Sequence, residues 1–209
     1  MKLLTKMQLL LLFLLISLSG CSLSPPPSLQ PVSVPSAAEA YAWQLNGNIL
    51  VRTPDDKVSS TLYWLEQPQL TDIQLISPIG TSLLALTITP KVANLTTNGE
   101  TYEGTNGEEL LQALTGWALP IAQMPLWVTG QVTDDMQVIS RDEQGRVAQA
   151  KTTGAQAWTI NYQQWQQQGG SEVPRLILLQ SDSIQVKIQI NRWQPLAPSS
   201  ATLTTNKRY

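Results

Sequence analysis

The sequence predicts a mostly β fold, in which an antiparallel sheet curls around one apolar interior and carries a helical insert. From Trp43 onward, apolar and polar residues alternate in short segments separated by turn residues, as in half-buried strands. A segment with helical features interrupts these strands between residues 106 and 130. Strands and helices do not alternate, which argues against a parallel sheet of β-α units. A curled sheet of about eight or more strands can enclose ligand space.

The strands before the helical insert are recognised by their alternation and by the turns between them. Leu45, Ile49 and Val51 share one face of the first strand, which ends at the turn Pro54-Asp55-Asp56. Further strands are expected at residues 61–64, 73–75 and 84–88, followed by a hairpin of 92–97 and 100–102 about Asn98-Gly99.

The helical insert has recognisable start and stop signals. Asn106, two early acids and Gly116 predict a helix over residues 108–115, and Pro125 with Gly130 predicts a shorter helix over 125–129. The glutamine-rich residues 163–168 are expected to form a polar loop at a strand end. Strands resume after the insert at 146–152, 158–162, 176–178 and 184–190, of which the last shows the cleanest alternation.

The alternation also predicts which side chains face the interior, because successive residues of a strand point to opposite faces of the sheet. The chain contains seven Trp and one Phe. Core packing and the lining of a cavity for irregular apolar ligands explain this tryptophan content equally well. The side chains expected to face the interior are Leu45, Ile49, Leu62, Trp64, Leu84, Leu86, Trp158, Ile160, Val186 and Ile188.

The first residues indicate secretion. Lys2 and Lys6 precede the apolar run Leu9–Ile16, which is the arrangement of a secretory signal. The run is shorter than the roughly 20 helical residues that span a bilayer. It also lacks the recurring polar face expected of a helix packed in the mature fold. Residues 1–20 are therefore predicted to be a lipoprotein signal peptide.

Leu18-Ser19-Gly20-Cys21 resembles the lipobox of bacterial lipoproteins, which implies cleavage before Cys21 and acylation of this residue. Cys21 is the only cysteine of the chain, so it cannot form an internal disulfide, and lipidation explains its presence. Acylation by several chains, such as palmitate, makes anchoring effectively permanent. Ser22 rather than an aspartate follows the cysteine, which in this class implies the outer membrane.

The rest of the chain divides into three parts. Residues 22–38 contain five prolines among serines and carry no charge, so 21–40 are expected to form an extended spacer. Residues 41–194 are long enough for one sizeable domain. Residues 195–209 are rich in Ser, Thr and Pro and are expected to form a flexible tail.

The composition argues against several functional classes. Without Lys2 and Lys6, 13 − 2 = 11 basic residues stand against 15 acidic ones, a formal charge of 11 − 15 = −4, and no basic cluster suggests nucleic acid. Because the chain has no histidine, the commonest general base and metal ligand is missing. We therefore expect no enzyme, no metal and no other cofactor. The acid pairs Asp55-Asp56, Glu108-Glu109 and Asp134-Asp135 lie in turn-like places or at a helix start.

The motifs between Trp43 and Trp193 resemble, in order, those of the LolB family. Residues 43–52 follow the family pattern W-x-L-x-G-x-I-x-x-R, and Pro78-Ile79-Gly80 takes the place of the P-L-G loop. Ile79 replaces leucine there, Ala157 stands where a glycine often precedes the tryptophan, and the tail extends beyond the usual end. The other matches are residues 59–64, Leu110-Leu111 through Gly116 and Pro120, Trp127-Val128-Thr129-Gly130, residues 156–162, Val173-Pro174-Arg175-Leu176 and Ile190-Asn191-Arg192-Trp193.

This resemblance implies an unclosed antiparallel β-barrel with a helical lid, the fold of LolA and LolB. It also implies a monomer, anchored on the periplasmic face of the outer membrane, that accepts acylated lipoproteins from the periplasmic carrier LolA and inserts them into that membrane. Cys21 is then the lipidation site, and Pro78, Ile79 and Gly80 form a membrane-insertion loop. The apolar cavity is expected to be lined by Leu45, Ile49, Leu62, Trp64, Leu84, Leu86, Trp158 and Ile160.

Two other functions stay open at the level of sequence. One is a lipid-anchored envelope protein that binds a lipid or an apolar peptide without inserting it. The other is a glycan hydrolase, which needs paired acids that the spacing does not supply. Ile79 separates a receptor from a passive binder, because delivery into a membrane benefits from an exposed apolar tip. A turn in which Ile79 folds back onto the barrel would remove that distinction.

Overall fold

The computed structural model describes residues 28–154 and 156–199, so Cys21, the expected signal peptide and most of the expected tail lie outside the described residues. Residues Leu29–Pro198 form one compact unit. The folded unit is thus wider than the limits 41 and 194 that the sequence predicts, because segments at both ends join its sheet. In the part of the chain that is described, no helix has the length and apolarity needed to cross a membrane.

The unit is built on one 12-stranded sheet with the strand order β7-β6-β5-β4-β3-β2-β12-β11-β10-β9-β8, and β1 pairs with β12 beside this path. Every pairing is antiparallel. The strands are β1 (Leu29–Pro31), β2 (Ala42–Arg52), β3 (Lys57–Gln67), β4 (Leu70–Ile76), β5 (Ser82–Ile88), β6 (Ala93–Thr97), β7 (Glu100–Gly104), β8 (Met136–Arg141), β9 (Val147–Thr152), β10 (Thr159–Gln168), β11 (Ser171–Gln180) and β12 (Gln185–Pro198).

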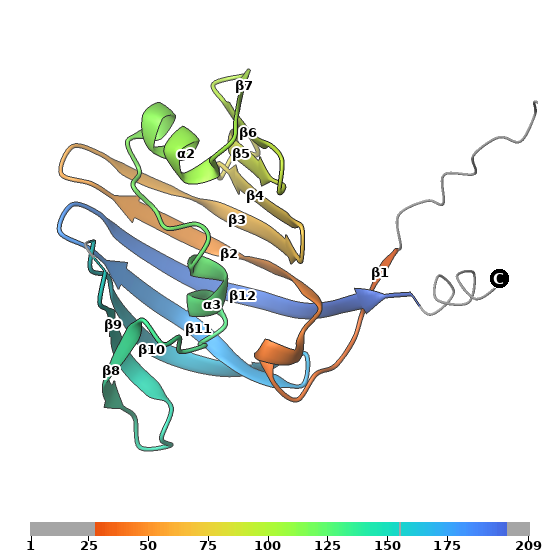
Figure 1. The fold of residues 1–209 in the computed structure, drawn as a ribbon, viewed down its shortest axis with the longest axis vertical. Helices are drawn as coiled ribbons and strands as arrows, with labels where there is room; N and C mark the ends of the chain where they lie inside the picture. The colour runs from red at the N-terminus through yellow and green to blue at the C-terminus, as the bar shows by residue number, and fades with distance from the viewer. Residues whose placement is uncertain (1–27, 155, 200–209) are drawn as a thin grey trace, which may run out of the picture. The chain divides into compact units, whose positions relative to one another are not determined.

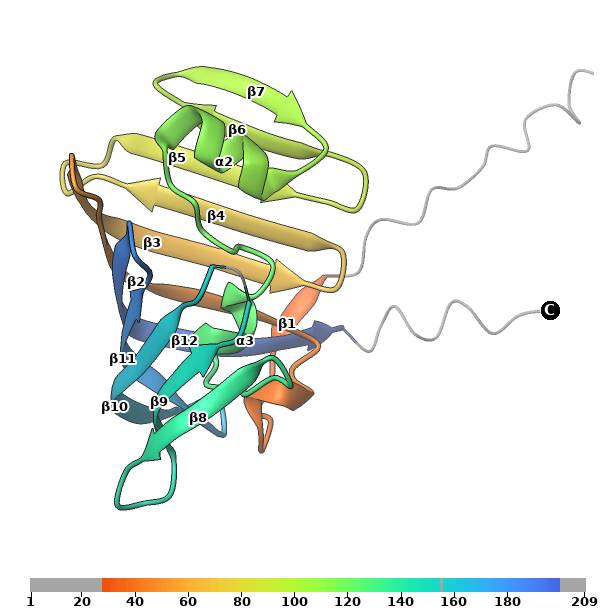
Figure 2. The ribbon, with the colours of Figure 1, turned by 60° about the vertical axis from the view of Figure 1, so that its left-hand side comes forward.

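The sheet is curled but not closed. Strands β7 and β8 lie at its two edges. Figures 1 and 2 show helices α2 (Gly107–Thr115) and α3 (Met124–Val128) over the concave face, while a short 3-10 helix, η1 (Ala37–Glu39), precedes β2. The predicted fold class, an unclosed antiparallel barrel with a helical lid, is confirmed.

The two helices begin and end close to the residues that the sequence predicts. The side chain of Asn106 caps α2 by accepting hydrogen bonds from the backbone N–H groups of Glu108 and Glu109. Gly116 ends the helix in the left-handed conformation with φ 75°, and its N–H donates to Gln112 O at 2.8 Å. Helix α3 starts with a proline in its first turn, where the missing N–H has no helical partner to lose.

Strands β2 and β12 join the two halves of the sheet through eleven paired positions. The approach is closest at Gly47, where an added Cβ would lie 2.0 Å from the carbonyl oxygen of Gln189. A bulge in β12 between Ile190 and Arg192 accompanies this contact and bends the strand. Glycine is therefore required here by the neighbouring backbone.

The glutamine-rich segment 163–168 forms the second half of β10, so the expected polar loop is wrong. Gln163, Gln164 and Gln167 are exposed, whereas Gln166 and Gln168 bond to the neighbouring backbone. Gln166 Nε2 donates to Ile190 O at 3.0 Å, and Gln168 Oε1 accepts from the Trp193 N–H at 2.7 Å. These hydrogen bonds satisfy backbone groups of β12 on either side of its bulge. A pattern of polar residues alone does not reveal such pairing.

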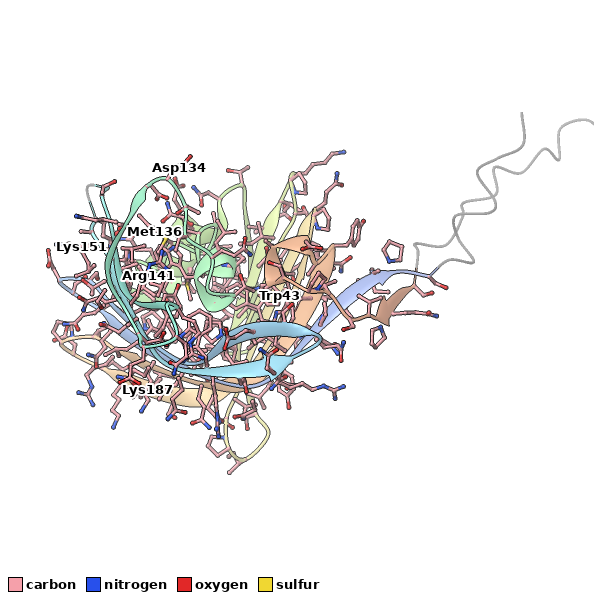
Figure 3. All side chains as sticks on the ribbon, turned by 90° about the horizontal axis from the view of Figure 1, so that it is seen from below. Trp43, Asp134, Met136, Arg141, Lys151 and Lys187 are labelled. Atoms are coloured by element: carbon pink, nitrogen blue, oxygen red, sulfur yellow. The ribbon has the colours of Figure 1, made fainter. Side chains whose placement is uncertain are left out.

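The interior is one apolar cluster on the concave side. All ten side chains expected to face it are buried, with exposed fractions between 0% and 7%. Figure 3 shows the same division by face, since Trp43 lies toward the interior whereas Lys187 points outward from β12. The alternation of the strands thus predicted their orientation correctly.

Candidate functional site

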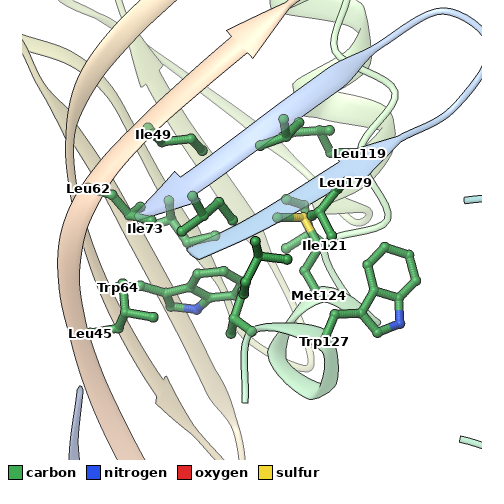
Figure 4. Packing of buried hydrophobic residues seen from close by; sticks show 14 of the residues in the cluster. Leu45, Ile49, Leu62, Trp64, Ile73, Leu119, Ile121, Met124, Trp127 and Leu179 are labelled. Atoms are coloured by element: carbon green, nitrogen blue, oxygen red, sulfur yellow. The ribbon is translucent and has the colours of Figure 1, made fainter. Parts of the chain in front are cut away.

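An apolar cavity lies between the strands β2–β5 and the helical segment above them. Figure 4 shows Ile49, Leu62 and Trp64 on the sheet side, facing Leu119, Ile121 and Met124. We call residues 107–128, which include α2, α3 and the segment between them, the lid. The lining consists of Ile49, Leu62, Trp64, Ile73, Leu75, Leu84, Leu86, Leu111, Trp117, Leu119, Ile121 and Met124, all of them apolar.

The cavity is small in this structure. Its volume is about 30 Å³, enough for only a few water molecules. Pockets that hold drug-sized ligands measure roughly 300–1,000 Å³. A ligand of that size therefore fits only when the lid moves away from the sheet, because the strands beneath are held by continuous backbone pairing.

Side-chain hydrogen bonds hold the lid together more firmly than they hold it to the sheet side. Within the lid, Glu108 Oε1 accepts from the Ala122 N–H at 2.9 Å, which ties the start of α2 to the segment before α3. Toward the rest of the unit, Gln156 Nε2 donates to Ala118 O at 3.5 Å, a long hydrogen bond. Contact with the sheet is made by apolar side chains such as Leu111 and Met124, which are 2% exposed. Apolar contacts supplemented by a long hydrogen bond suit a lid that opens.

Five of the eight residues expected to line the cavity do so, namely Ile49, Leu62, Trp64, Leu84 and Leu86. The other three, Leu45, Trp158 and Ile160, are buried but lie outside this cavity. Trp158 instead packs on Trp127 of α3, with ring centroids 6.0 Å apart. The missed lining residues come chiefly from the lid segment 117–124, in which small apolar residues rather than polar ones separate Trp117, Leu119 and Ile121, so that no contrast between apolar and polar positions marks a buried face. Ile73 and Leu75 continue the pattern of their strand and were recognisable.

The β4–β5 turn exposes a single large apolar side chain. Ile79 is 90% exposed, the highest value among the large hydrophobic residues that the structure describes. The Ser77 N–H donates to Thr81 O at 2.8 Å, and the Gly80 N–H donates to Ser77 O at 2.9 Å. Gly80 has φ 86°, which lets the chain reverse directly after Ile79. Pro78, Ile79 and Gly80 do not line the cavity.

Glu66 lies beside the cavity at the end of β3. Its carboxylate accepts hydrogen bonds from Trp64 Nε1 at 3.0 Å and from Thr71 Oγ1 at 3.0 Å. Burial raises the pKa of the Glu66 carboxyl above its usual value, although these two hydrogen bonds oppose the shift. Because Trp64 lines the cavity, Glu66 holds one wall residue in place.

The amino-acid sequence matches the sequence model of the family described as "Outer membrane lipoprotein LolB" over residues 41–193. An outer-membrane lipoprotein LolB of Shewanella loihica is 41% identical over 90% of this chain and 88% of its own length. That of Shewanella woodyi is 39% identical over 98% of this chain and 96% of its own length. Among solved structures, a LolA superfamily protein from Nitrosomonas europaea covers 78% of this chain and 90% of its own length with a TM-score of 0.47 and 11% identity.

Proposed function

Because this chain belongs to the LolB family of outer-membrane lipoproteins, we propose that it receives acylated lipoproteins and transfers them into the outer membrane. The donor in this proposal is the periplasmic carrier LolA, and the acyl groups of the cargo are held between sheet and lid. Transfer of this kind makes and breaks no covalent bond, so it needs neither a catalytic group nor a cofactor.

One observation supports the proposal above the others, namely that the cavity has no polar lining residue. Twelve apolar side chains surround it, and burying each methylene of an acyl chain among them contributes about 0.8 kcal/mol. A polar ligand would find no hydrogen-bond partner there and would lose its bonds to water. The lining therefore favours the acyl groups of a cargo over its polypeptide.

The exposed Ile79 supports delivery rather than passive binding. An apolar side chain at a tight turn stabilises nothing within the fold, because it is 90% exposed. It can contribute when it meets a lipid phase, which is where the cargo must go. We therefore propose that the loop of Pro78, Ile79 and Gly80 acts in insertion, and that Cys21 carries the lipid anchor.

The proposal is tested by loading with acylated and non-acylated forms of one cargo lipoprotein from the purified carrier. Only the acylated form should transfer to the wild-type chain. Leu111→Glu places a carboxylate on the cavity side of α2 and should abolish retention, whereas Gln112→Glu adds the same charge on the exposed side and should not. Circular dichroism verifies that both variants keep the sheet. Equal transfer of the two cargo forms would overturn the proposal.

A further inference from the structure

Residues 29–34, which the sequence places in a spacer, are bonded to the folded unit. Strand β1 pairs with the end of β12, with Leu29 opposite Pro198 and Pro31 opposite Leu196. Beyond the strand, the Val32 N–H donates to Pro195 O at 3.0 Å and the Val34 N–H donates to Gly169 O at 2.8 Å. We call residues 29–34 and these contacts the linker clamp.

Side chains of the folded unit reinforce the linker clamp. Ser171, which is 1% exposed, donates its hydroxyl to Val34 O at 2.7 Å. Gln194 Nε2 donates to Val32 O at 3.0 Å. Gly170 lies so close that an added Cβ would be 2.2 Å from Ser33 Oγ. Backbone bonds, side-chain bonds and close packing together hold the segment on the domain.

The linker clamp shortens the tether to the membrane. From Cys21 to Leu29 there are 29 − 21 = 8 Cα steps, which span at most about 28 Å when fully extended. A spacer that was free up to Tyr41 would have 41 − 21 = 20 steps and a reach of about 70 Å. The anchored domain is thus held near the bilayer by the end of the sheet that carries the clamp.

The two turns beside the linker clamp are uncharged, although Glu66 and Glu172 directly flank them and Lys91 lies in the β5–β6 turn at the same end of the sheet. We call the clamp, residues 67–70 of the β3–β4 turn and residues 168–171 of the β10–β11 turn the clamp end, and these segments contain no Asp, Glu, Lys or Arg. At the opposite end of the same strands, the β2–β3 turn carries Asp55 and Asp56 and the β11–β12 turn carries Asp182. Carboxylates are repelled by anionic headgroups and are costly to desolvate, so this distribution suits a clamp end that faces lipid.

A cleft of mixed polarity opens beside the clamp end. It has a volume of about 250 Å³, and its lining includes Ala38, Pro68 and Leu126 together with Glu66 and Gln131. Tyr41 also lines the cleft and is 51% exposed. Tyrosine is enriched at the boundary between bilayer and water, because its ring is apolar and its hydroxyl polar. Two carboxylates are exceptions here, Glu39 on the neighbouring 3-10 helix and Glu66 in the lining of the cleft.

We propose that the clamp end is the surface by which the domain docks on the lipid bilayer that holds its anchor. The proposal rests on acylation of Cys21 but not on the transfer of cargo. The β4–β5 turn with Ile79 lies at the other end of β4 from the β3–β4 turn. A short tether therefore lets Ile79 reach the same bilayer only when the strands incline toward the membrane plane.

The experiment measures the depth of two labels on the acylated full chain in vesicles of phosphatidylethanolamine and phosphatidylglycerol. Gln69→Cys labels the clamp end and Ser183→Cys the opposite end, both at exposed positions, and the acylated Cys21 does not react with the dye. Quenching by nitroxide-labelled lipid should be strong at residue 69 and weak at residue 183. Equal quenching, or the reverse order, would overturn the proposal.

A second pair of variants tests the linker clamp itself. Replacing Val32 and Val34 together by Pro removes the two N–H donors, whereas replacing both by Ala keeps them. In the proline pair, quenching should become similar at the two labels, whereas in the alanine pair it should stay stronger at residue 69 than at residue 183. Insertion of eight Ser and Pro residues before Ser28 lengthens the tether without touching the clamp and should have the same effect as the proline pair. If quenching at residue 69 still exceeds quenching at residue 183 in both the proline pair and the insertion variant, the tether does not orient the domain.

Discussion

Ile79 is an apolar residue whose side chain lies almost entirely in solvent. Exposure forgoes the roughly 1.5–3 kcal/mol that burial of an isoleucine contributes, and no contact within the unit compensates for it. Its frame is rigid, since Pro78 restricts φ and Gly80 reverses the chain with φ 86°. The turn thus presents the side chain outward in a defined way.

We predict that Ile79→Glu changes the free energy of unfolding by no more than about 0.5 kcal/mol. Acceptance of acylated cargo should be unchanged, but delivery to vesicles should be lost, because a carboxylate does not enter lipid. A transfer assay that scores receptor-bound and membrane-inserted cargo separately checks both statements. Ile79→Leu is the control and should insert normally. Normal insertion by the Glu variant would leave the passive binder as the better explanation.

Ionisation of Glu66 makes the free energy of unfolding depend on pH. Its pKa is raised by burial, so the ionised form is disfavoured in the folded chain relative to the unfolded one. The stabilisation from protonated Glu66 is fully present below the unfolded pKa and is lost as pH rises through the folded pKa. At neutral pH the ionised carboxylate therefore costs stability.

We predict that Glu66→Gln is more stable than the wild type at neutral pH, because the amide keeps an acceptor for Trp64 Nε1 without a buried charge. The difference should shrink as pH falls through the raised pKa of folded Glu66 and should level off below the ordinary value of 4.5. Urea midpoints measured from pH 3 to 8 test this, with Glu39→Gln as the exposed control for net charge. A variant less stable than wild type at neutral pH would mean that the two hydrogen bonds outweigh burial.

At the scale of single residues, sequence alternation predicted orientation but not membership of the cavity. Ile49, Leu62 and Leu84 face the interior because of their place in a strand, and the pattern shows that directly. Whether such a residue lines a cavity or packs solidly depends on what covers it. Trp158 is covered by Trp127, and that contact between distant segments has no local signal.

Strands β2 and β12 form the element on which both halves of the sheet depend. Gly47 lies at their closest approach, with the Gln189 carbonyl where a Cβ would be. The obstacle is backbone, so the clash cannot be relieved by turning a side chain. Relief requires the two strands to separate locally, which breaks hydrogen bonds on both sides.

We predict that Gly47→Ala lowers the free energy of unfolding by at least the 1–3 kcal/mol or so that is typical of overpacking. Asn48→Ala, one residue along and exposed, should change it far less. Chemical denaturation followed by tryptophan fluorescence compares the two variants. If Gly47→Ala lowers the free energy of unfolding no more than Asn48→Ala does, the two strands move apart at little energetic cost.

Elements with local signals were predicted well and elements without them were not. Helix α2 has a capping Asn106 and a terminal Gly116, so the sequence predicts where it begins and ends. The polar glutamines in the second half of β10 predict a loop, but the segment is a strand. Their bonds to Ile190 and Trp193 come from a strand more than twenty residues away, and such pairing is invisible to a local pattern.

At the scale of the whole molecule, the fold class and the outer-membrane localisation predicted from the sequence are confirmed. The pairing of β1 with β12 was not foreseen, because it joins Leu29 to Pro198 across almost the whole domain. Proline-rich composition alone is typical of a free spacer. The linker clamp shows that tertiary contacts can override it.

The cavity between sheet and lid is too small in this structure to hold an acyl chain, since its volume is about 30 Å³. The sheet is unsuited to expand, since its strands are paired on both sides, whereas the lid rests on apolar contacts and one long hydrogen bond from Gln156 to Ala118. Binding of an acylated lipopeptide should therefore speed hydrogen exchange in residues 107–128 and leave β2, β3 and β12 protected. The same peptide without acyl groups is the control and should change neither region. Unchanged lid exchange with the acylated peptide bound would place the acyl chains outside this cavity.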